Sequence, residues 1–387
     1  MSILVVNAGS STLKCSLFDE ISLSLHDAKP LAVENMEVSG GHSLGFESAF
    51  TEIVDKLFQA STHSQDSVKM VAHRIVHGGP ELSSITLIRD DVLAKIEAQS
   101  DLAPTHNPNA ISCIYAARKL FGTTIPQLAM FDTSFHKTIP GVRKFYSVPH
   151  RWVEEYGIRK YGFHGINHAY CANRVEEIIG EKIKRIIICH LGSGCSLCAV
   201  LDGSSVNTTM GFTPMEGLMM ATRCGSIDPG ILMYLINNKK LDPKKLDSDL
   251  NKHSGLLGVG ETADMRVILK KKDAGDGRAE LAFNMFVDRL CYHIAAMTAS
   301  LGGLDALVFT AGIGENSPEV RAAVSHTLSY LGVELDDEVN QKKDVTADAT
   351  ISKVSSKVKV LKIKAREELE IARQCAKFAH SAERSIN

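Results

Sequence analysis

Residues 5–14 read "VVNAGSSTLK", an apolar, β-branched run that gives way to small and hydroxylated residues within two positions. Residues 186–202, "IIICHLGSGCSLCAVLD", follow the same plan, and one shift of 183 positions (192 − 9, 202 − 19) places Gly9 on Gly192 and Asp19 on Asp202. Each copy predicts a strand, a Gly/Ser turn and a second alternating strand, which together make a β-hairpin. Two such hairpins half a chain apart predict a duplicated fold.

Strands and helices alternate along the rest of the chain, which predicts α/β units with a buried sheet in each half. The expected strands are 68–76, 125–131 and 306–309, and the expected helices are 109–121 and 279–301. A third Gly-rich turn, residues 307–318 "LVFTAGIGENSP", leads into a helix start at Pro318. There, Gly312 and Gly314 are expected to let the backbone approach a ligand closely.

The two hairpin tips are candidate phosphate sites. Loops of Gly, Ser and Thr expose several backbone N–H groups and hydroxyls together, although neither a Walker P-loop nor a full G-x-G-x-x-G occurs. The first stretch on its own would be read as an ordinary hairpin turn. If the two halves face one another, however, both tips converge on the cleft between them, and the ligand held there is expected to be a polyphosphate.

Composition narrows the class of partner. At 387 residues the chain is long enough for two domains. Its 43 basic and 45 acidic residues form no long run of one sign, which argues against nucleic acid or a membrane surface and favours small molecules. Nine scattered cysteines fit reduced thiols, and Cys195-x-x-Cys198 lacks the second pair of a zinc site. Without a leader-like or membrane-spanning apolar segment, the protein is expected to be cytoplasmic.

Many ordered motifs resemble those of the acetate kinase family, within the actin, hexokinase and heat-shock ATPase superfamily. They are NAGSSTLK (7–14), HRIVHGG (73–79), LAPTHNP (102–108), FDTSFH (131–136), YGFHGINH (161–168), CHLGSG (189–194), GFTPMEGL (211–218), TRCGSIDPG (222–230), DMR (264–266), TAGIGENS (310–317) and REELEIA (366–372). The resemblance implies an α/β, duplicated actin-like ATPase fold with two domains and a central cleft. Its domains would be residues 1–134 with 369–387, and residues 135–368, the second carrying most nucleotide contacts and a homodimer interface.

The resemblance further implies reversible transfer of the ATP γ-phosphoryl to acetate, giving acetyl phosphate and ADP by in-line displacement. A carboxylate is already an anion at neutral pH, so no strong base is needed and the difficulty is its repulsion from phosphate. The implied catalytic residues are Arg74 on the carboxylate, Arg223 and His164 on the transferring phosphoryl, and Asp132. Because the nucleophile needs no deprotonation, we expect Asp132 to orient an arginine or a metal-bound water.

Further site residues follow from the resemblance. Mg²⁺, or Mn²⁺, would be held by Asn7 and by Glu367 at the start of an amphipathic helix. The acyl pocket would comprise Val76, Thr105, Phe163 and Pro214. The nucleotide contacts would be Lys14, His190, Leu191, Gly192, Ser193, Gly194, Asp264, Met265, Arg266, Gly312, Ile313, Gly314, Glu315 and Asn316.

Four positions depart from the family pattern: Thr105 and Ser226 replace the usual Leu and Asp, and Ser193 and Ala221 replace the usual Asn and Gly. Thr105 bears most on the substrate, because one methylene in an apolar pocket changes specificity by only about 1–3 kcal/mol. Propionate therefore stays an alternative to acetate. A more remote alternative is an actin-like or chaperone-like ATPase, but such proteins keep an Asp in the first loop, where this chain has Asn7.

Overall fold

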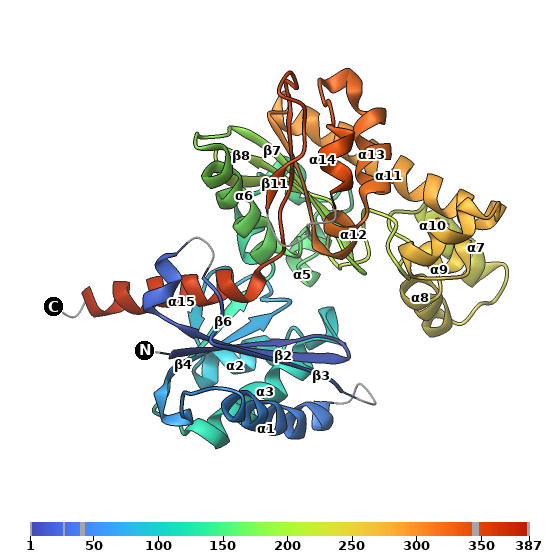
Figure 1. Cartoon of the computed structure of the whole chain (residues 1–387). Helices are drawn as coiled ribbons and strands as arrows, with labels where there is room; N and C mark the ends of the chain where they lie inside the picture. Colours follow the sequence, from blue (N-terminus) through green and yellow to red (C-terminus); the bar gives the residue numbers. More distant parts are fainter. Residues whose placement is uncertain (1, 26–27, 39–42, 343–347, 385–387) are drawn as a thin grey trace. The chain divides into compact units, whose positions relative to one another are not determined.

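The computed structural model describes residues 2–25, 28–38, 43–342 and 348–384. The chain divides into two compact units (Figure 1): the first comprises Met1–Lys137, Gly165–Asn167 and Arg366–Asn387, and the second comprises Thr138–His164 and His168–Ala365. The domain limits given above stay predictions, and residues 1 and 385–387 among them lie outside the described residues.

The first unit is built on a six-stranded sheet of order β3-β2-β1-β4-β6-β5. Strands β1, β4 and β6 run parallel, and β2, β3 and β5 are antiparallel to their neighbours. Helices α1 and α3 cover one face and α15 crosses the other (Figure 1). The elements are β1 (Ser2–Ala8), β2 (Thr12–Asp19), β3 (Ala32–Glu37), α1 (Ser43–Gln59), β4 (Val68–Ile75), β5 (Thr86–Leu87), α2 (Asp90–Glu97), α3 (Asn107–Phe121), β6 (Gln127–Phe131) and α15 (Glu367–Arg384).

Alternation along β2 decides which face of the first hairpin is buried. Leu13, Cys15 and Leu17 share one hydrophobic core with Phe46 and Phe50 of α1. Full burial of a Leu or Phe side chain contributes about 1.5–3 kcal/mol. A different register would expose these side chains, so the core fixes the hairpin.

The second unit repeats this topology, with the sheet order β11-β12-β10-β7-β8-β9. Its elements are α4 (Gly141–Lys144), α5 (Arg151–Tyr156), α6 (Gly165–Ile179, whose first three residues belong to the first unit), β7 (Arg185–Leu191), β8 (Cys195–Leu201), β9 (Ser204–Thr208), α7 (Pro229–Asn237), α8 (Pro243–Lys252), α9 (Gly255–Gly260), α10 (Met265–Asp273), α11 (Gly277–Leu301), β10 (Ala306–Thr310), α12 (Ala311–Asn316), α13 (Pro318–Thr327), α14 (Asp337–Gln341), β11 (Ala349–Thr350) and β12 (Lys359–Lys362).

The predicted duplication is confirmed strand by strand. In both sheets the hairpin is followed by a third antiparallel strand. The first strand pairs in parallel with one later strand, that strand pairs in parallel with a second, and a short antiparallel strand closes the edge. The fold class expected from the sequence, two α/β halves with a mixed sheet each, is therefore correct.

The single offset of 183 is correct for the first strand of each hairpin and wrong for the second. Ala8 pairs with Leu13, whereas Leu191 pairs with Cys195, so the second tip is one residue shorter. Leu13 therefore corresponds to Cys195 and not to Ser196. A slip of one residue moves a side chain to the opposite face of a sheet. Cys195 therefore takes the place that Leu13 has in the first hairpin, and Ser196 lies on the other face of the second sheet.

The third predicted Gly-rich turn is instead the short helix α12. It starts at Ala311, whose φ of 64° lies in the left-handed region that costs a non-glycine residue about 1–2 kcal/mol. A Cβ on Gly314 would lie 3.3 Å from the backbone carbon of Phe309, whereas one on Gly312 would have nothing within 4 Å. Gly314 thus permits packing of α12 on β10, and only Gly312 has open space beside it.

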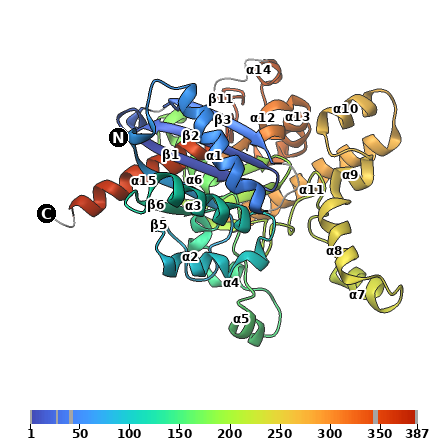
Figure 2. The same cartoon turned by 90° about the horizontal axis from the view of Figure 1, so that it is seen from below.

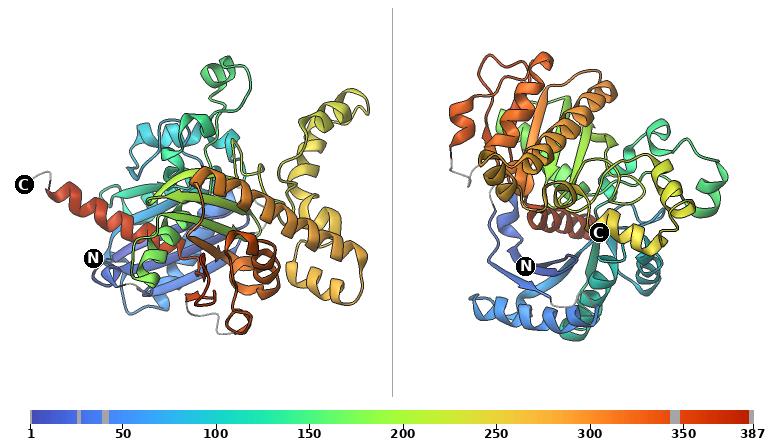
Figure 3. Two further views of the ribbon diagram at one scale, coloured as in Figure 1. Left: turned by 90° about the horizontal axis from the view of Figure 1, so that it is seen from above. Right: turned by 90° about the vertical axis from the view of Figure 1, so that its right-hand side faces the viewer.

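A group of small helices gathers at one end of the long helix α11 (Figures 2 and 3). The other end of α11 packs on β7, β8 and β9, while α9 and α10 pack on α11 away from that sheet. Among the described residues, no helix combines the length and apolarity needed to cross a bilayer.

Candidate active site

Polar side chains of the first unit meet where its parallel strands end. Asn7 lies near the end of β1, Arg74 near the end of β4, and Asp132 directly after β6, while Glu367 opens α15. Ligand sites of α/β sheets form at the carboxyl ends of parallel strands. The sequence predicted these four residues, and the structure brings all four together within the first unit.

Arg74 is the centre of this cluster. Its Nε and Nη2 donate to the two carboxylate oxygens of Asp132 at 3.0 and 2.7 Å, and Nη1 donates to Asn7 Oδ1 at 3.1 Å. Nη1 also lies 3.2 Å from Glu367 Oε2. Burial disfavours the guanidinium charge, but the charges of Asp132 and Glu367 more than offset this and raise the pKa of Arg74 above its ordinary value.

A second acid of α15 completes the cluster, and the sequence prediction did not include it. Glu368 pairs with Lys14 at 2.9 Å and accepts a hydrogen bond from Asn7 Nδ2 at 3.0 Å. Burial acts to raise the pKa of Glu368, but Lys14 and these hydrogen bonds lower it below the usual range. Burial raises the pKa of Glu367 to about 7. The charges of Asp132 and Glu368 also raise it, whereas the charge of Arg74 lowers it.

Two predicted acyl-pocket residues belong to this unit. Val76 is buried just beyond β4, and Thr105 is exposed with its hydroxyl 2.9 Å from His106 Nδ1. Asn109 Nδ2 donates to the carbonyl of Gly9 at 2.9 Å and to that of Thr105 at 3.0 Å. The first hairpin tip and the Thr105 loop are thereby fixed to α3.

The second unit places two predicted catalytic residues beside its own hairpin tip. A Cβ on Gly194 would lie 3.4 Å from Arg223 Nη1 and 3.5 Å from His164 Nε2. The ring of His190 stacks on that of His164 at a centroid distance of 4.0 Å and an interplanar angle of 14°. His164, His190 and Arg223 therefore surround one small space next to Gly194.

Arg223 is a partly buried cation that hydrogen-bonds to neutral groups. Nη1 donates to the carbonyl of Pro214 at 3.1 Å and lies 3.8 Å from the sulfur of Met220. Within the described parts of the chain, no carboxylate pairs with this guanidinium, and burial lowers the pKa of Arg223. Of the two remaining acyl-pocket candidates, Phe163 is buried and Pro214 is half-buried. A cation left in this state is a ready site for an anion.

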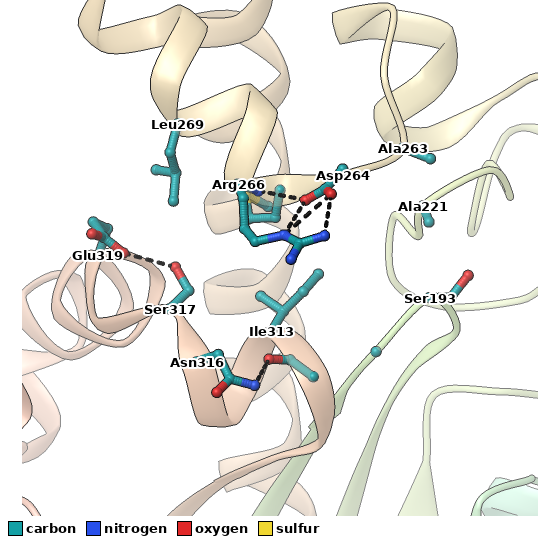
Figure 4. Close-up of a pocket in the computed structure, with 13 residues that line it drawn as sticks. Ser193, Ala221, Ala263, Asp264, Arg266, Leu269, Ile313, Asn316, Ser317 and Glu319 are labelled. Atoms are coloured by element: carbon teal, nitrogen blue, oxygen red, sulfur yellow. Dashed lines mark hydrogen bonds and ion pairs between the residues drawn. The ribbon is translucent and has the colours of Figure 1, made fainter. Parts of the chain in front are cut away.

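A cavity of about 730 Å³ opens beside the same tip, within the second unit (Figure 4). Ser193 and Ala221 lie on one side of it, and Leu269 and Glu319 on the opposite side. Asp264 caps α10 by accepting from Arg266 N, and its carboxylate pairs with the Arg266 guanidinium at 2.6 Å. Ser317 Oγ and Glu319 Oε2 are 3.0 Å apart on the cavity wall.

Most of the predicted nucleotide contacts line this cavity. They are Gly192, Ser193, Asp264, Met265, Arg266, Gly312, Ile313 and Asn316. His190, Leu191, Gly194, Gly314 and Glu315 are not among its lining residues, and Lys14 belongs to the first unit. Sequence reasoning missed Ala263, Leu269, Ser317 and Glu319 as cavity residues, and it named Ala221 only as a departure from the family pattern. The signal that could have found Ser317 and Glu319 is their place at the N-cap and in the first turn of α13.

A buried arginine holds α12, which contributes Gly312, Ile313 and Asn316 to the cavity wall. Arg321 Nη1 donates to the carbonyls of Gly314 and Glu315 at 2.9 and 2.8 Å, and Nε donates to Asn340 Oδ1 at 2.7 Å. Burial lowers the pKa of Arg321 to about 10. Its charge faces the carbonyls at the end of α12, where a helix favours a cation.

Comparison with known proteins gives one consistent family. The model of the acetokinase family matches residues 2–373. The acetate kinase of Gloeothece citriformis is 44% identical over 402 residues, covering 97% of this chain and 98% of that protein. The structure of Porphyromonas gingivalis acetate kinase is similar, with a TM-score of 0.85, 34% identity and coverage of 96% and 98%. A propionate kinase from Francisella tularensis is similar at a TM-score of 0.84, 34% identity and the same coverage.

Proposed function

Because the chain belongs to the acetokinase family, we propose that it is an acetate kinase, which transfers the γ-phosphoryl of ATP reversibly to acetate and forms acetyl phosphate and ADP. The observation that carries this proposal is the Arg223 guanidinium, which faces neutral partners beside a cavity large enough for a nucleotide. Propionate is the second candidate acceptor, because a propionate kinase is structurally as similar to this chain as an acetate kinase is.

In this reaction the protein positions charges more than it moves protons. Acetate arrives as the nucleophilic anion, and phosphoryl transfer depends on alignment and on stabilisation of charge on the equatorial oxygens. We assign Arg223 and His164 to the transferring phosphoryl and Arg74 to the acetate carboxylate. Asp132 holds the planar fork of Arg74 through two parallel hydrogen bonds, which supports an orienting role rather than proton transfer.

The nucleotide would occupy the cavity of Figure 4, with its phosphates toward Gly192 and Ser193 and its base toward Leu269. Backbone N–H groups at a Gly/Ser tip suit phosphate oxygens, and the apolar side chains of Met265 and Ile313 suit a purine. Lys14, His190, Leu191, Gly194, Gly314 and Glu315 stay proposals as nucleotide contacts, and so do Val76, Thr105, Phe163 and Pro214 as the acyl pocket.

A divalent cation fits the charge of the first-unit cluster. Three acids, Asp132, Glu367 and Glu368, face two cations, Arg74 and Lys14, so negative charge is in excess when Glu367 is ionised. The described residues contain no group of three or more His, Cys, Asp or Glu placed to hold a metal. Mg²⁺ needs none, since it takes one or two carboxylates with phosphate oxygens and water. We assign Asn7 and Glu367 to Mg²⁺, with Mn²⁺ as the alternative; when bound, the ion neutralises phosphate charge.

Removal of divalent cations is expected to abolish turnover, and added Mg²⁺ to restore it. In Glu367→Gln the Mg²⁺ concentration for half-maximal rate is expected to rise roughly 10–100-fold, because one charge-assisted contact is worth about 1.5–3 kcal/mol. Glu97→Gln, an exposed acid on α2, is the matched control. An unchanged Mg²⁺ requirement in Glu367→Gln would remove Glu367 from the metal site.

Two further assignments concern the whole protein. Helix α7 has no buried residue and exposes Ile231, Met233 and Tyr234. These exposed apolar side chains support a homodimer formed by the second unit. Sedimentation should then give twice the 42.1 kDa chain mass.

The cysteines, all of them free, support a reducing compartment, and we propose the cytoplasm. Detection of the protein in a secreted fraction would contradict this.

An acyl-phosphate trap tests the function directly. Purified protein with ATP, Mg²⁺, acetate and hydroxylamine is expected to yield acetohydroxamate, whereas an ATPase would consume ATP without any hydroxamate. Across acetate, propionate and butyrate, kcat/KM is expected to be highest for acetate and to fall about 10–200-fold per added methylene. A higher value for propionate would replace acetate by propionate as the assigned acceptor.

A further inference from the structure

Three side chains of the second unit form a hydrogen-bonded chain that ends at the Gly194 tip. His164 Nδ1 lies 2.9 Å from Ser196 Oγ, and His168 Nε2 lies 2.8 Å from the same oxygen. Ser196 and His168 are fully buried. Ser196 lies next to Cys195 on β8, so its side chain is on the opposite face of the strand, where it reaches the two rings.

One hydroxyl hydrogen cannot serve both imidazoles, so the chain has a direction. Ser196 can donate to at most one ring nitrogen, and it accepts an N–H from the other ring or from both. In one arrangement His164 donates from Nδ1, and its neutral ring then has a bare Nε2. In the other, His168 donates from Nε2 to Ser196, Ser196 donates to His164 Nδ1, and neutral His164 carries its hydrogen on Nε2.

The surroundings of His164 favour the second arrangement. Its Nε2 and the Arg223 guanidinium border the same space at Gly194, and the His190 ring is stacked on it. A second full positive charge on the His164 ring beside Arg223 would be repelled. An oxygen of a transferring phosphoryl in that space accepts hydrogen bonds and gives none, so a useful neutral ring there must present an N–H.

We propose that His168 and Ser196 are positioning residues that hold neutral His164 in the tautomer with its hydrogen on Nε2, so that it donates to the transferring phosphoryl. This inference rests on the proposed function for the identity of the acceptor. His168 sets the direction of the hydrogen bonds by donating to Ser196, and Ser196 in turn donates to His164. No proton is transferred along these hydrogen bonds. Neither residue was among the site residues expected from the sequence.

A double-mutant cycle measures the coupling. Ser196→Ala is expected to lower kcat roughly 3–10-fold, the worth of one neutral hydrogen bond, with KM for ATP and acetate unchanged. His164→Ala is expected to lower kcat about 10²–10³-fold, and Ser196→Ala should then cost nothing more. Ser205→Ala removes another buried hydroxyl, on β9, and is the matched control with unchanged kcat. Independent, multiplicative losses in the double variant would overturn the proposal.

Conservative replacement of His168 separates the effect of its hydrogen bond from the effect of its packing. The Nε2 of a glutamine can donate where His168 Nε2 does, so His168→Gln is expected to keep kcat within about threefold of the unmodified enzyme. His168→Leu fills similar space without a donor and is expected to match Ser196→Ala. Equal loss in His168→Gln and His168→Leu, with equal Tm, would contradict the assigned role of the hydrogen bond between His168 and Ser196.

Nitrogen-15 spectra of histidine-labelled full-length protein read the tautomer without turnover. The His164 signal, assigned by its absence from His164→Ala, is expected to show a protonated Nε2 and a bare Nδ1, and to shift toward a mixture in Ser196→Ala. A His164 protonated on Nδ1, or on both nitrogens, would overturn the inference. The spectra need no acyl acceptor, so they test the tautomer separately from the reaction. If the protein showed the predicted tautomer but formed no acyl phosphate, the proposed function would be wrong and the inference about His168 and Ser196 would stand.

Discussion

Replacement of Arg223 by alanine is expected to lower kcat by about 10³-fold or more, the usual worth of an arginine placed on a transferring phosphoryl, while the free energy of unfolding stays unchanged or rises slightly. The two effects separate because, among the described residues, the guanidinium hydrogen-bonds to neutral groups, the Pro214 carbonyl and the Met220 sulfur, and pairs with no carboxylate. Burial without a carboxylate makes its charge a cost to the free protein. Steady-state kinetics and urea denaturation check the two parts.

Arg223→Lys distinguishes charge from shape. Lysine keeps the cation but lacks the planar fork, so it is expected to recover only part of the lost kcat at unchanged stability. A loss of stability in Arg223→Ala as large as the loss of activity would mean that Arg223 holds the fold together. A kcat within tenfold of the unmodified protein would remove Arg223 from the phosphoryl site.

The sequence was sufficient for the topology because hairpins and alternation are local. The runs around Val5 and Ile187 predicted the two hairpins, and the strands that follow each of them predicted two α/β halves. The register of the second hairpin was not predictable in this way. Every residue of β8 but Leu201 is buried, so hydrophobicity does not mark its faces, and the missing residue in the tip left no compositional signal.

Residues of the candidate site were predictable where a motif ends a strand, and not where the contact is tertiary. Arg74 lies near the end of one apolar strand and Asp132 follows another, and these strands lie side by side in one sheet. Glu368, by contrast, is one of several acids in the first turn of α15, and only folding brings it onto Lys14. Ser317 and Glu319 resembled ordinary helix-start residues, although both line the cavity.

Loss of Arg74 is expected to damage both stability and activity, in contrast to loss of Arg223. Arg74→Ala leaves the carboxylates of Asp132 and Glu367 buried without their cation, and breaking a buried pair costs about 3–5 kcal/mol. The acetate KM is also expected to rise steeply, since the proposed carboxylate partner is gone. Urea denaturation with a chelator present, to exclude divalent cations, measures the first effect.

A matched control is Arg118, whose partner Asp90 is almost fully exposed. A surface pair is worth about 0–1 kcal/mol, so Arg118→Ala should change the free energy of unfolding by no more than that. If Arg74→Ala were equally mild, Arg74 would not be the cation that stabilises Asp132 and Glu367 in this buried cluster.

Removing one of those acids as well tests the account of why Arg74 matters. In Arg74→Met/Asp132→Asn the charged pair is replaced by neutral groups of similar size, so most of the stability lost in Arg74→Ala is expected to return, while acetate binding stays poor. Recovered stability without recovered turnover would show that Arg74 has two separable tasks: it neutralises Asp132 in the free protein and presents its remaining N–H groups to acetate. Recovery of both would mean that Arg74 serves only to neutralise Asp132, and acetate would need another cation, for which Arg223 is the candidate.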